Sequence, residues 1–134
     1  MKFLSFLAAI VFLTACSGGS AVSKQLSGAD SLIINFNTPQ TNTIDKTTYT
    51  TESKAIKKLA RFVDGKSAEA YKCGYDGNLM FYKKGQLVGD VVFNYSGDGC
   101  HHFIMELEGK LTPTAMSNEA ADFLRSMAEG RGWY

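Results

Sequence analysis

The amino-acid sequence predicts a single α+β domain, in which an antiparallel sheet of about five strands carries two helices on one face. Segments with apolar residues at alternating positions predict strands, and two segments with a period of 3.6 residues predict helices. These elements follow one another in the order ββαβββα. With 134 residues, 45% of them hydrophobic and 20% charged, the chain can form one core but not two large domains.

The first two strands are predicted from alternation and composition. Leu32, Ile34 and Phe36 lie on one face of an alternating segment, and Pro39, which cannot continue a strand ladder, marks its end. Residues 43–51 are rich in threonine, which favours strands on a mostly polar surface. We therefore expect a second strand at an edge of the sheet.

Two segments have the helical period. The first covers residues 52–63, where apolar positions three and four residues apart form one stripe, and Gly65 is a natural stop. Its apolar positions are Ile56, Leu59, Ala60 and Val63. The second begins near Ser117, a good N-cap residue, and ends near Gly130. Both apolar stripes need a sheet face to cover them.

Residues 78–108 predict a three-stranded meander, because turn residues separate three strand-forming segments. Lys84-Gly85 forms the first predicted turn and residues 96–99 form the second. We expect Phe93 to pair with His101, which makes one face of the meander almost entirely apolar. The other face is mixed, includes Asp90 and His102, and is expected to face water or a ligand.

The beginning of the chain predicts export. Lys2 precedes an apolar run over residues 3–14, and small residues follow it. A run of about a dozen residues is too short for a stable transmembrane helix, which needs ~20 apolar residues. We therefore predict a signal peptide over residues 1–15.

At the end of this run, Leu13-Thr14-Ala15-Cys16 resembles the lipobox of bacterial lipoproteins. The resemblance implies that the Cys16 thiol carries diacylglycerol, that the signal is cut before Cys16, and that the new amino terminus is acylated. Several acyl chains on one residue form a stable anchor, because each buried CH₂ contributes ~0.8 kcal/mol. Ser17 resembles the pattern that directs lipoproteins to the outer membrane, so we expect the periplasmic face of that membrane. An ordinary soluble export signal is the alternative.

The segment after Cys16 shows no hydrophobic periodicity and is rich in Ser, Gly and Ala. We expect residues 16–30 to be a lipidated cysteine and a flexible tether with a span of ~20 Å. The folded domain is then expected to cover residues 31–134.

Two cysteines remain after the lipidated one, in a compartment that oxidises thiols. The predicted pairing places Cys73 and Cys100 at the same end of the sheet, so we predict a disulfide between them. Metal binding by Cys73, Cys100 and His102 is the alternative if the thiols stay reduced. Adjacent strand residues point to opposite faces, which argues against a catalytic pair of Cys100 and His101.

The predicted first helix carries a row of basic residues, Lys54, Lys57, Lys58 and Arg61. Such a row is either a solvated helix face or a contact for anionic headgroups or another polyanion. The formal net charge of +1 gives no case for general nucleic-acid binding. None of the sequence motifs of common hydrolases, phosphate-binding loops or zinc proteases is present.

We therefore expect a lipid-anchored domain of the cell envelope that binds an unknown envelope protein or ligand, without catalysis or a cofactor. The basic helix residues, Asp90 and His102 are the expected binding surface. A periplasmic metal-binding protein using Cys73, Cys100 and His102 is one alternative. A small envelope enzyme, with a pocket that joins His102 to Asp90 or Glu106, is the other.

Overall fold

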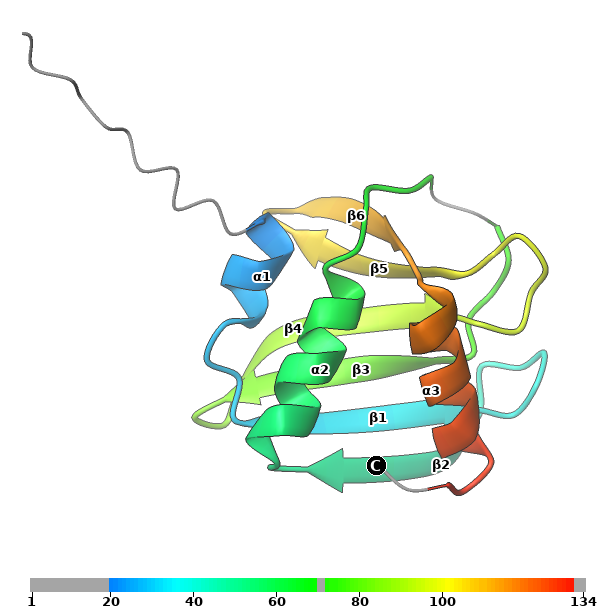
Figure 1. Ribbon diagram of the computed structural model, residues 1–134, viewed down its shortest axis with the longest axis horizontal. Coiled ribbons are helices and arrows are strands. Elements are labelled where there is room, and N and C mark those ends of the chain that lie inside the picture. Colours follow the sequence, from blue (N-terminus) through cyan, green and yellow to red (C-terminus); the bar gives the residue numbers. More distant parts are fainter. Residues whose placement is uncertain (1–19, 70–71, 132–134) are drawn as a thin grey trace, which may run out of the picture.

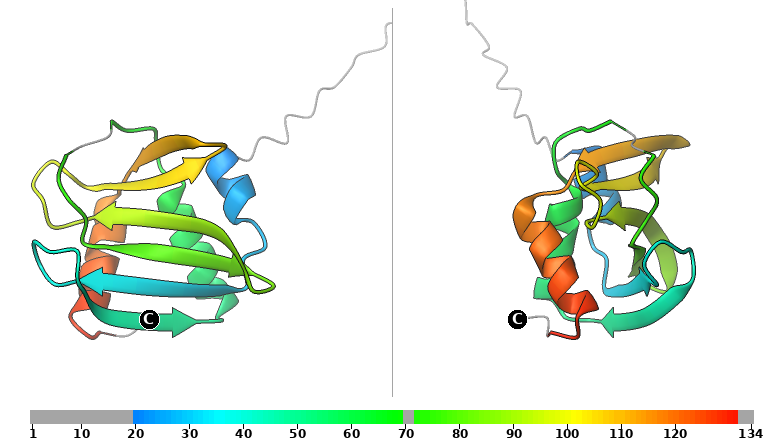
Figure 2. Two further views of the ribbon diagram at one scale, coloured as in Figure 1. Left: turned by 180° about the vertical axis from the view of Figure 1, so that it is seen from behind. Right: turned by 90° about the vertical axis from the view of Figure 1, so that its right-hand side faces the viewer.

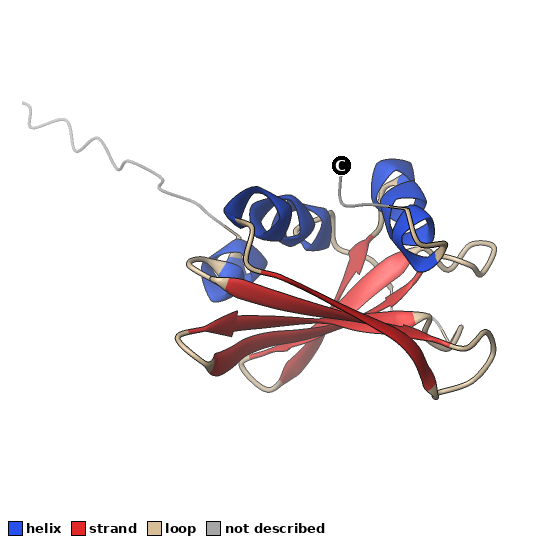
Figure 3. Ribbon diagram, turned by 90° about the horizontal axis from the view of Figure 1, so that it is seen from below, coloured by secondary structure: helices blue, strands red, loops and turns tan. Residues whose placement is uncertain are grey.

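The computed structural model describes residues 20–69 and 72–131. In this part of the chain, six antiparallel strands form one sheet in the order β2-β1-β3-β4-β5-β6, and the helices lie on one of its faces (Figures 1 and 3). The strands are β1 (Ser31–Asn37), β2 (Ile44–Thr50), β3 (Gly77–Lys83), β4 (Gln86–Asn94), β5 (His102–Leu107) and β6 (Lys110–Ala115). The helices are α1 (Ala21–Leu26), α2 (Ser53–Val63) and α3 (Asn118–Ala128). The predicted α+β class is confirmed, whereas the expected elements lacked one strand and one helix.

The additional strand, β6, escaped prediction because Pro113 lies inside it. Proline has no N–H to donate to a ladder, but an edge strand tolerates it. Pro113 pairs with Ile104 of β5, and its carbonyl accepts a hydrogen bond from the N–H of Ala68 at 3.1 Å. The sheet therefore ends in a proline-containing strand that the chain after α2 partly covers.

Two of the hairpin turns have the same conformation. The predicted turn at Lys84-Gly85 has φ values of 50° and 76°, and the turn at Glu108-Gly109 has φ values of 49° and 77°. Two successive positive φ values are typical of a type I′ turn, whose twist matches that of the flanking strands. Glycine at the second position allows this backbone at little cost.

The additional helix, α1, lies where a flexible tether was predicted, so the tether prediction for residues 16–30 was wrong from Ser20 onward. The Ser20 hydroxyl caps α1 by accepting a hydrogen bond from the N–H of Ser23 at 3.0 Å. Val22 and Leu26, one turn apart, are buried in the core. Six residues are too few to show a helical period, and such a helix is stable only through its packing. The predicted signal peptide and Cys16 lie outside the described residues.

The core lies between the helices and the apolar face of the sheet (Figure 3). The helices contribute the predicted stripes, including Leu59 of α2 and Leu124 of α3, both fully buried. The fully buried apolar residues of the strands are Leu32, Ile34, Leu79, Phe81, Val91, Phe93 and Phe103. Burial of these side chains is the main contribution to stability, at ~25 cal/mol per Å² of apolar surface removed from water.

The register between β4 and β5 differs from the prediction by two residues. Phe93 pairs with Phe103 rather than with His101, and Val91 pairs with Met105. A shift of two residues keeps every side chain on its expected face, whereas a shift of one would exchange the faces. The loop between the two strands is longer than the predicted turn at residues 96–99, because β4 ends at Asn94 and β5 begins only at His102.

The connection from α2 to β3, called here the wrapping segment (residues 64–69 and 72–76), passes the β6 edge to the sheet face without helices (Figures 1 and 2). Near β6, the N–H of Ala115 donates to the carbonyl of Lys66 at 2.7 Å. A Cβ at Gly65 would lie 2.3 Å from the carbonyl oxygen of Ala115, so this approach requires glycine. The segment thereby occupies part of an edge that would otherwise offer free backbone groups.

Candidate functional site

The basic residues of α2 do not form one face. Lys54, Lys57 and Arg61 are exposed along one side of the helix. Lys58 is half-buried between α2 and α3, with its Nζ 4.6 Å from the centroid of the Phe123 ring, where a cation–π contact is favourable. Within residues 20–69 and 72–131, neither Lys54, Lys57 nor Arg61 forms an ion pair. We call these three residues the basic stripe.

A cavity of about 360 Å³ lies beside the basic stripe, between α1 and α2. Its apolar lining includes Leu26, Ala29, Ile56 and Ala60. Its charged lining residues are Lys57, Arg61 and Asp64, and the hydroxyl of Ser20 donates a hydrogen bond to the Asp64 carboxylate. The chain that leads to Cys16 thus enters the domain beside this cavity.

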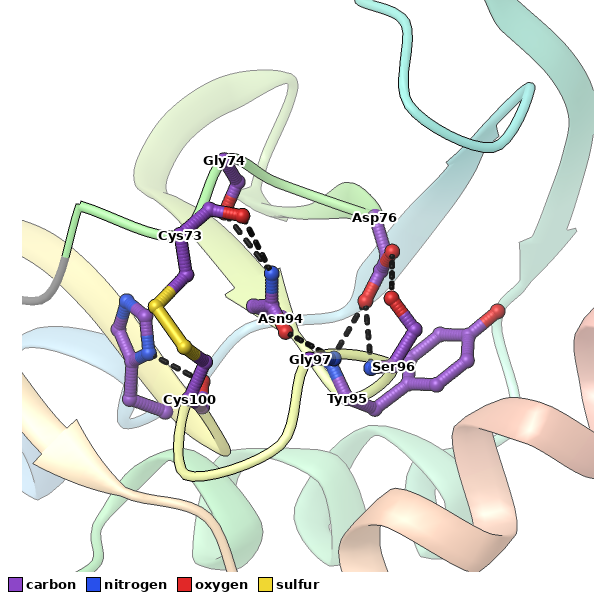
Figure 4. Close-up of a disulfide and its surroundings, with 9 residues drawn as sticks. Cys73, Gly74, Asp76, Asn94, Tyr95, Ser96, Gly97 and Cys100 are labelled. Carbon is purple, nitrogen blue, oxygen red and sulfur yellow. Dashed lines mark hydrogen bonds between the residues drawn. A yellow bond between two sulfur atoms is a disulfide. The ribbon is translucent and has the colours of Figure 1, made fainter.

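The predicted disulfide between Cys73 and Cys100 is confirmed, with a Cα–Cα distance of 6.1 Å (Figure 4). It joins the wrapping segment to the β4–β5 loop. The buried Asn94 side chain supports the same junction, because its Nδ2 donates to the carbonyls of Cys73 and Gly74 at 3.1 and 3.0 Å. Its Oδ1 accepts from the N–H of Gly97 at 3.0 Å. All these contacts hold the loop and the segment in place.

Asp76 fixes the beginning of the β4–β5 loop (Figure 4). Its carboxylate accepts hydrogen bonds from the N–H groups of Tyr95 and Ser96 at 2.7 and 2.9 Å, and from the Ser96 hydroxyl at 2.7 Å. Burial raises the pKa of the Tyr95 hydroxyl above its ordinary value, and the Asp76 charge raises it as well, while Arg125 acts in the opposite direction. The carboxylate of Asp76 therefore has a structural task.

His102 was expected on the accessible binding surface, and this prediction was wrong because the side chain is 0% exposed. It pairs with Asn94, over which the wrapping segment lies, and its ring Nδ1 hydrogen-bonds to the carbonyl oxygen of Cys100. In the structure, the disulfide removes the thiolates that a Cys73, Cys100 and His102 metal site needs. Among the described residues, no group of three or more His, Cys, Asp or Glu residues is placed to hold a metal ion.

The sheet face without helices, called here the open face, carries a row of hydrogen-bonded polar side chains across β2, β1, β3 and β4. The Thr47 hydroxyl donates to Asn35 Oδ1 at 2.7 Å, and Asn35 Nδ2 donates to Asn78 Oδ1 at 3.0 Å. Asn78 Nδ2 then donates to Asp90 Oδ1 at 2.7 Å. This row orients the exposed Asp90 carboxylate at the surface.

Beyond this row, the open face has a shallow groove of about 470 Å³ over β4, β5 and the β6 edge. The large apolar side chains around it are exposed, with Leu111 at 71%, Leu87 at 49% and Tyr75 at 42%. Its charged lining residues are Asp90 and Glu106, and none of the described Lys or Arg residues lines it. We call this feature the open-face groove. His102 is not among its lining residues, so the expected pocket that joins it to Asp90 or Glu106 is not formed there.

Sequence reasoning placed Asp90 and Glu106 on the side of the meander that was expected to face water or a ligand, and it missed the exposed apolar residues Leu111 and Tyr75 of the groove. Leu111 lies on the strand that proline concealed, and Tyr75 lies in a loop that has no regular period. One signal was available, because Asn35, Asn78 and Asp90 all occupy polar positions within alternating segments. Polar residues at alternating positions on neighbouring strands form cross-strand pairs.

No helix in the part of the chain that the structure describes has the length and apolar character needed to cross a bilayer. No known family model matches the chain, no curated protein matches its sequence, and no solved structure matches it.

Proposed function

We propose that this protein is a lipid-anchored, non-catalytic binding module of the bacterial cell envelope, and that its open-face groove holds a segment of a partner protein. The partner segment combines apolar side chains with at least one Lys or Arg. The anchor is Cys16, on the periplasmic face of the outer membrane.

The observation that carries this proposal is the uncovered apolar surface around the open-face groove. Three large apolar side chains that line the groove are exposed, namely those of Leu87, Leu111 and Tyr75. The opposite face of the same sheet is buried by helices. Contiguous exposed apolar surface of this kind marks interaction sites in soluble domains. A shallow groove on a rigid sheet suits an extended or helical protein segment better than a small molecule, which favours deep, enclosed sites.

Charge complementarity defines the partner further. Asp90 and Glu106 line the groove, and its lining within the described part of the chain includes no basic residue. Asn78 holds one Asp90 oxygen at 2.7 Å, so the carboxylate is oriented before a ligand arrives. An arginine or lysine that reaches this carboxylate would form a charge-assisted hydrogen bond with little loss of side-chain freedom.

Capture from intact cells tests this function. The acylated protein is expressed in its host as wild type, as Asp90→Lys and as Asp98→Lys, which makes the same charge change at an exposed loop position. Neighbouring proteins are crosslinked and recovered with each form. We expect one partner that wild type and Asp98→Lys recover and that Asp90→Lys loses at least tenfold, since charge reversal replaces attraction by repulsion.

Two outcomes contradict the proposal. One is recovery of the same proteins by all three forms, which would remove the groove from the interaction. The other is a defined small-molecule turnover that disappears from extracts on gene deletion and returns with the purified protein. Mass spectrometry of the protein from its host tests the anchor separately, with diacylglycerol on Cys16 as the expected result.

A further inference from the structure

The connection between the proposed lipid anchor and the folded domain is shorter in the structure than the predicted tether. Ser20 is the first described residue, its hydroxyl donates to Asp64 at the C-cap of α2, and α1 packs into the core directly after it. Three residues lie between Cys16 and Ser20, which makes four Cα–Cα steps, and a fully extended chain spans at most ~3.6 Å per step. The fixed point of the domain therefore lies within ~14 Å of Cys16.

The basic stripe begins at this fixed point. Arg61 precedes the C-cap residue Asp64 by three residues, Lys57 precedes it by seven and Lys54 by ten, so the three basic residues lie on one side of α2. At 1.5 Å per residue, the stripe extends ~15 Å along α2 from the position where Ser20 is held. Its side chains are exposed and, in the described part of the chain, unpaired with acidic groups.

We infer that the basic stripe is a membrane-contact surface that binds the headgroups of anionic phospholipids. The inference rests on the anchor at Cys16 in the proposed function and adds an orientation to it. The stripe lies against the bilayer, and the open-face groove on the opposite side of the sheet points away from it.

Two physical arguments favour the bilayer as the occupant. Electrostatic attraction to headgroups decays over ~8 Å at physiological ionic strength, so only a domain held close to the surface profits from it. The short connection between Cys16 and Ser20 holds the domain this close to the bilayer without a partner protein. Of the carboxylates near the stripe, Asp64 accepts the Ser20 hydrogen bond and Glu52 stands at the far end of α2, so positive charge dominates the side between them.

Lysine labelling on vesicles tests the orientation. The mature chain, residues 16–134, has Cys16 as its one cysteine outside the disulfide, so that thiol can be coupled to a maleimide lipid in vesicles. The vesicles contain either phosphatidylcholine alone or phosphatidylcholine with phosphatidylglycerol. An amine-reactive ester labels exposed lysines, and mass spectrometry gives the rate at each site. Lys72, exposed in the wrapping segment, is the internal reference.

We expect Lys54 and Lys57 to react several-fold more slowly than Lys72 on anionic vesicles, and at their unprotected rates in 1 M salt or on neutral vesicles. Neutralising Lys57 and Arg61 together, as Lys57→Gln and Arg61→Gln, should lower the ratio of docked to undocked protein ~25-fold. This follows because each basic group near an anionic leaflet contributes about fivefold. Lys54 then reports the loss. The matched control, Lys83→Gln with Lys84→Gln, should leave Lys54 protected.

Equal labelling of Lys57 on neutral and anionic vesicles would overturn this inference. Protection that occurs in host membranes but not on anionic vesicles would overturn it too, because a protein would then cover the stripe. Failure of the anchor is a separate result, seen as unmodified Cys16 in protein from the host. The coupled chain reports on the stripe in either case.

Discussion

The two faces of the sheet use neighbouring residues of the same strands for different purposes. On β4, Val91 faces the helices and is fully buried, whereas Val92 lies half-buried on the open face and lines the groove. The covered face carries the apolar packing that stabilises the fold. The open face carries a polar row that ends at Asp90, a second carboxylate at Glu106, and exposed apolar side chains. Strand alternation therefore separates the packing that stabilises the fold from the surface that we propose for binding.

The largest expected effect comes from the disulfide that holds the wrapping segment over one end of the open face. Replacing both cysteines, Cys73→Ser with Cys100→Ser, should lower the free energy of unfolding by ~3.5 kcal/mol in the chain-entropy model for this loop of 27 residues. Urea unfolding of the two forms measures the change. A loss below about 1 kcal/mol would mean that the segment stays in place without the bond.

A matched pair on β4 compares the two faces directly. Val91→Ala should cost ~2–3 kcal/mol, because it removes two buried methyl groups and leaves a cavity. Val92→Ala, which makes the same chemical change on the open face, should cost less than half as much. Thermal and urea unfolding give both values. Equal losses would refute the division of roles between the two faces.

Polar residues of the open face should contribute differently to the free energy of unfolding, depending on whether the wrapping segment covers them. Asn94→Ala removes three hydrogen bonds that tie the wrapping segment to the β4–β5 loop, and should cost ~1–3 kcal/mol. Asp90→Ala changes an exposed carboxylate and should alter stability by about 0.5 kcal/mol or less. If Asp90→Ala proved the more destabilising, its carboxylate would be part of the fold rather than a binding group.

The smallest expected effect is a pH dependence at Tyr95. The folded protein raises the pKa of this hydroxyl, mainly through burial and then through Asp76. The resulting stability is therefore complete below pH ~10, the pKa in the unfolded chain, and is lost as the pH rises through the folded value. Tyr95→Phe should flatten the fall of the urea midpoint above pH ~10, whereas Tyr75→Phe at an exposed position should not. Identical alkaline profiles for both variants would contradict this.

The fold was largely predictable because alternation keeps side chains on their faces when the pairing shifts by an even number of residues. Phe93 and Phe103 lie on the expected face although their pairing was predicted two residues away. The parts that were missed depend on tertiary contacts. Helix α1 exists through the burial of Val22 and Leu26, and β6 tolerates Pro113 because the strand lies at an edge.

The candidate site was less predictable than the fold, for a related reason. The two cysteines could be placed at one end of the sheet by counting along strands. Asp90 could be placed on the open face because it lies at an alternating position of its strand. Burial of His102 depends on the wrapping segment, which crosses to the open face. This segment has no periodic sequence pattern and contains no helix or named strand, so the sequence did not predict its path. Exposure of Leu111 likewise follows from the position of β6 at the edge.

The central claim is that the molecule has a membrane side and a partner side, and paired photo-crosslinking in host envelopes tests it most directly. A benzophenone amino acid is placed either at Leu111, beside the open-face groove, or at Ser23, which lines the cavity next to the basic stripe. The account predicts a protein adduct from Leu111 and phospholipid adducts from Ser23. Lipid adducts at Leu111 with a protein adduct at Ser23 would contradict it.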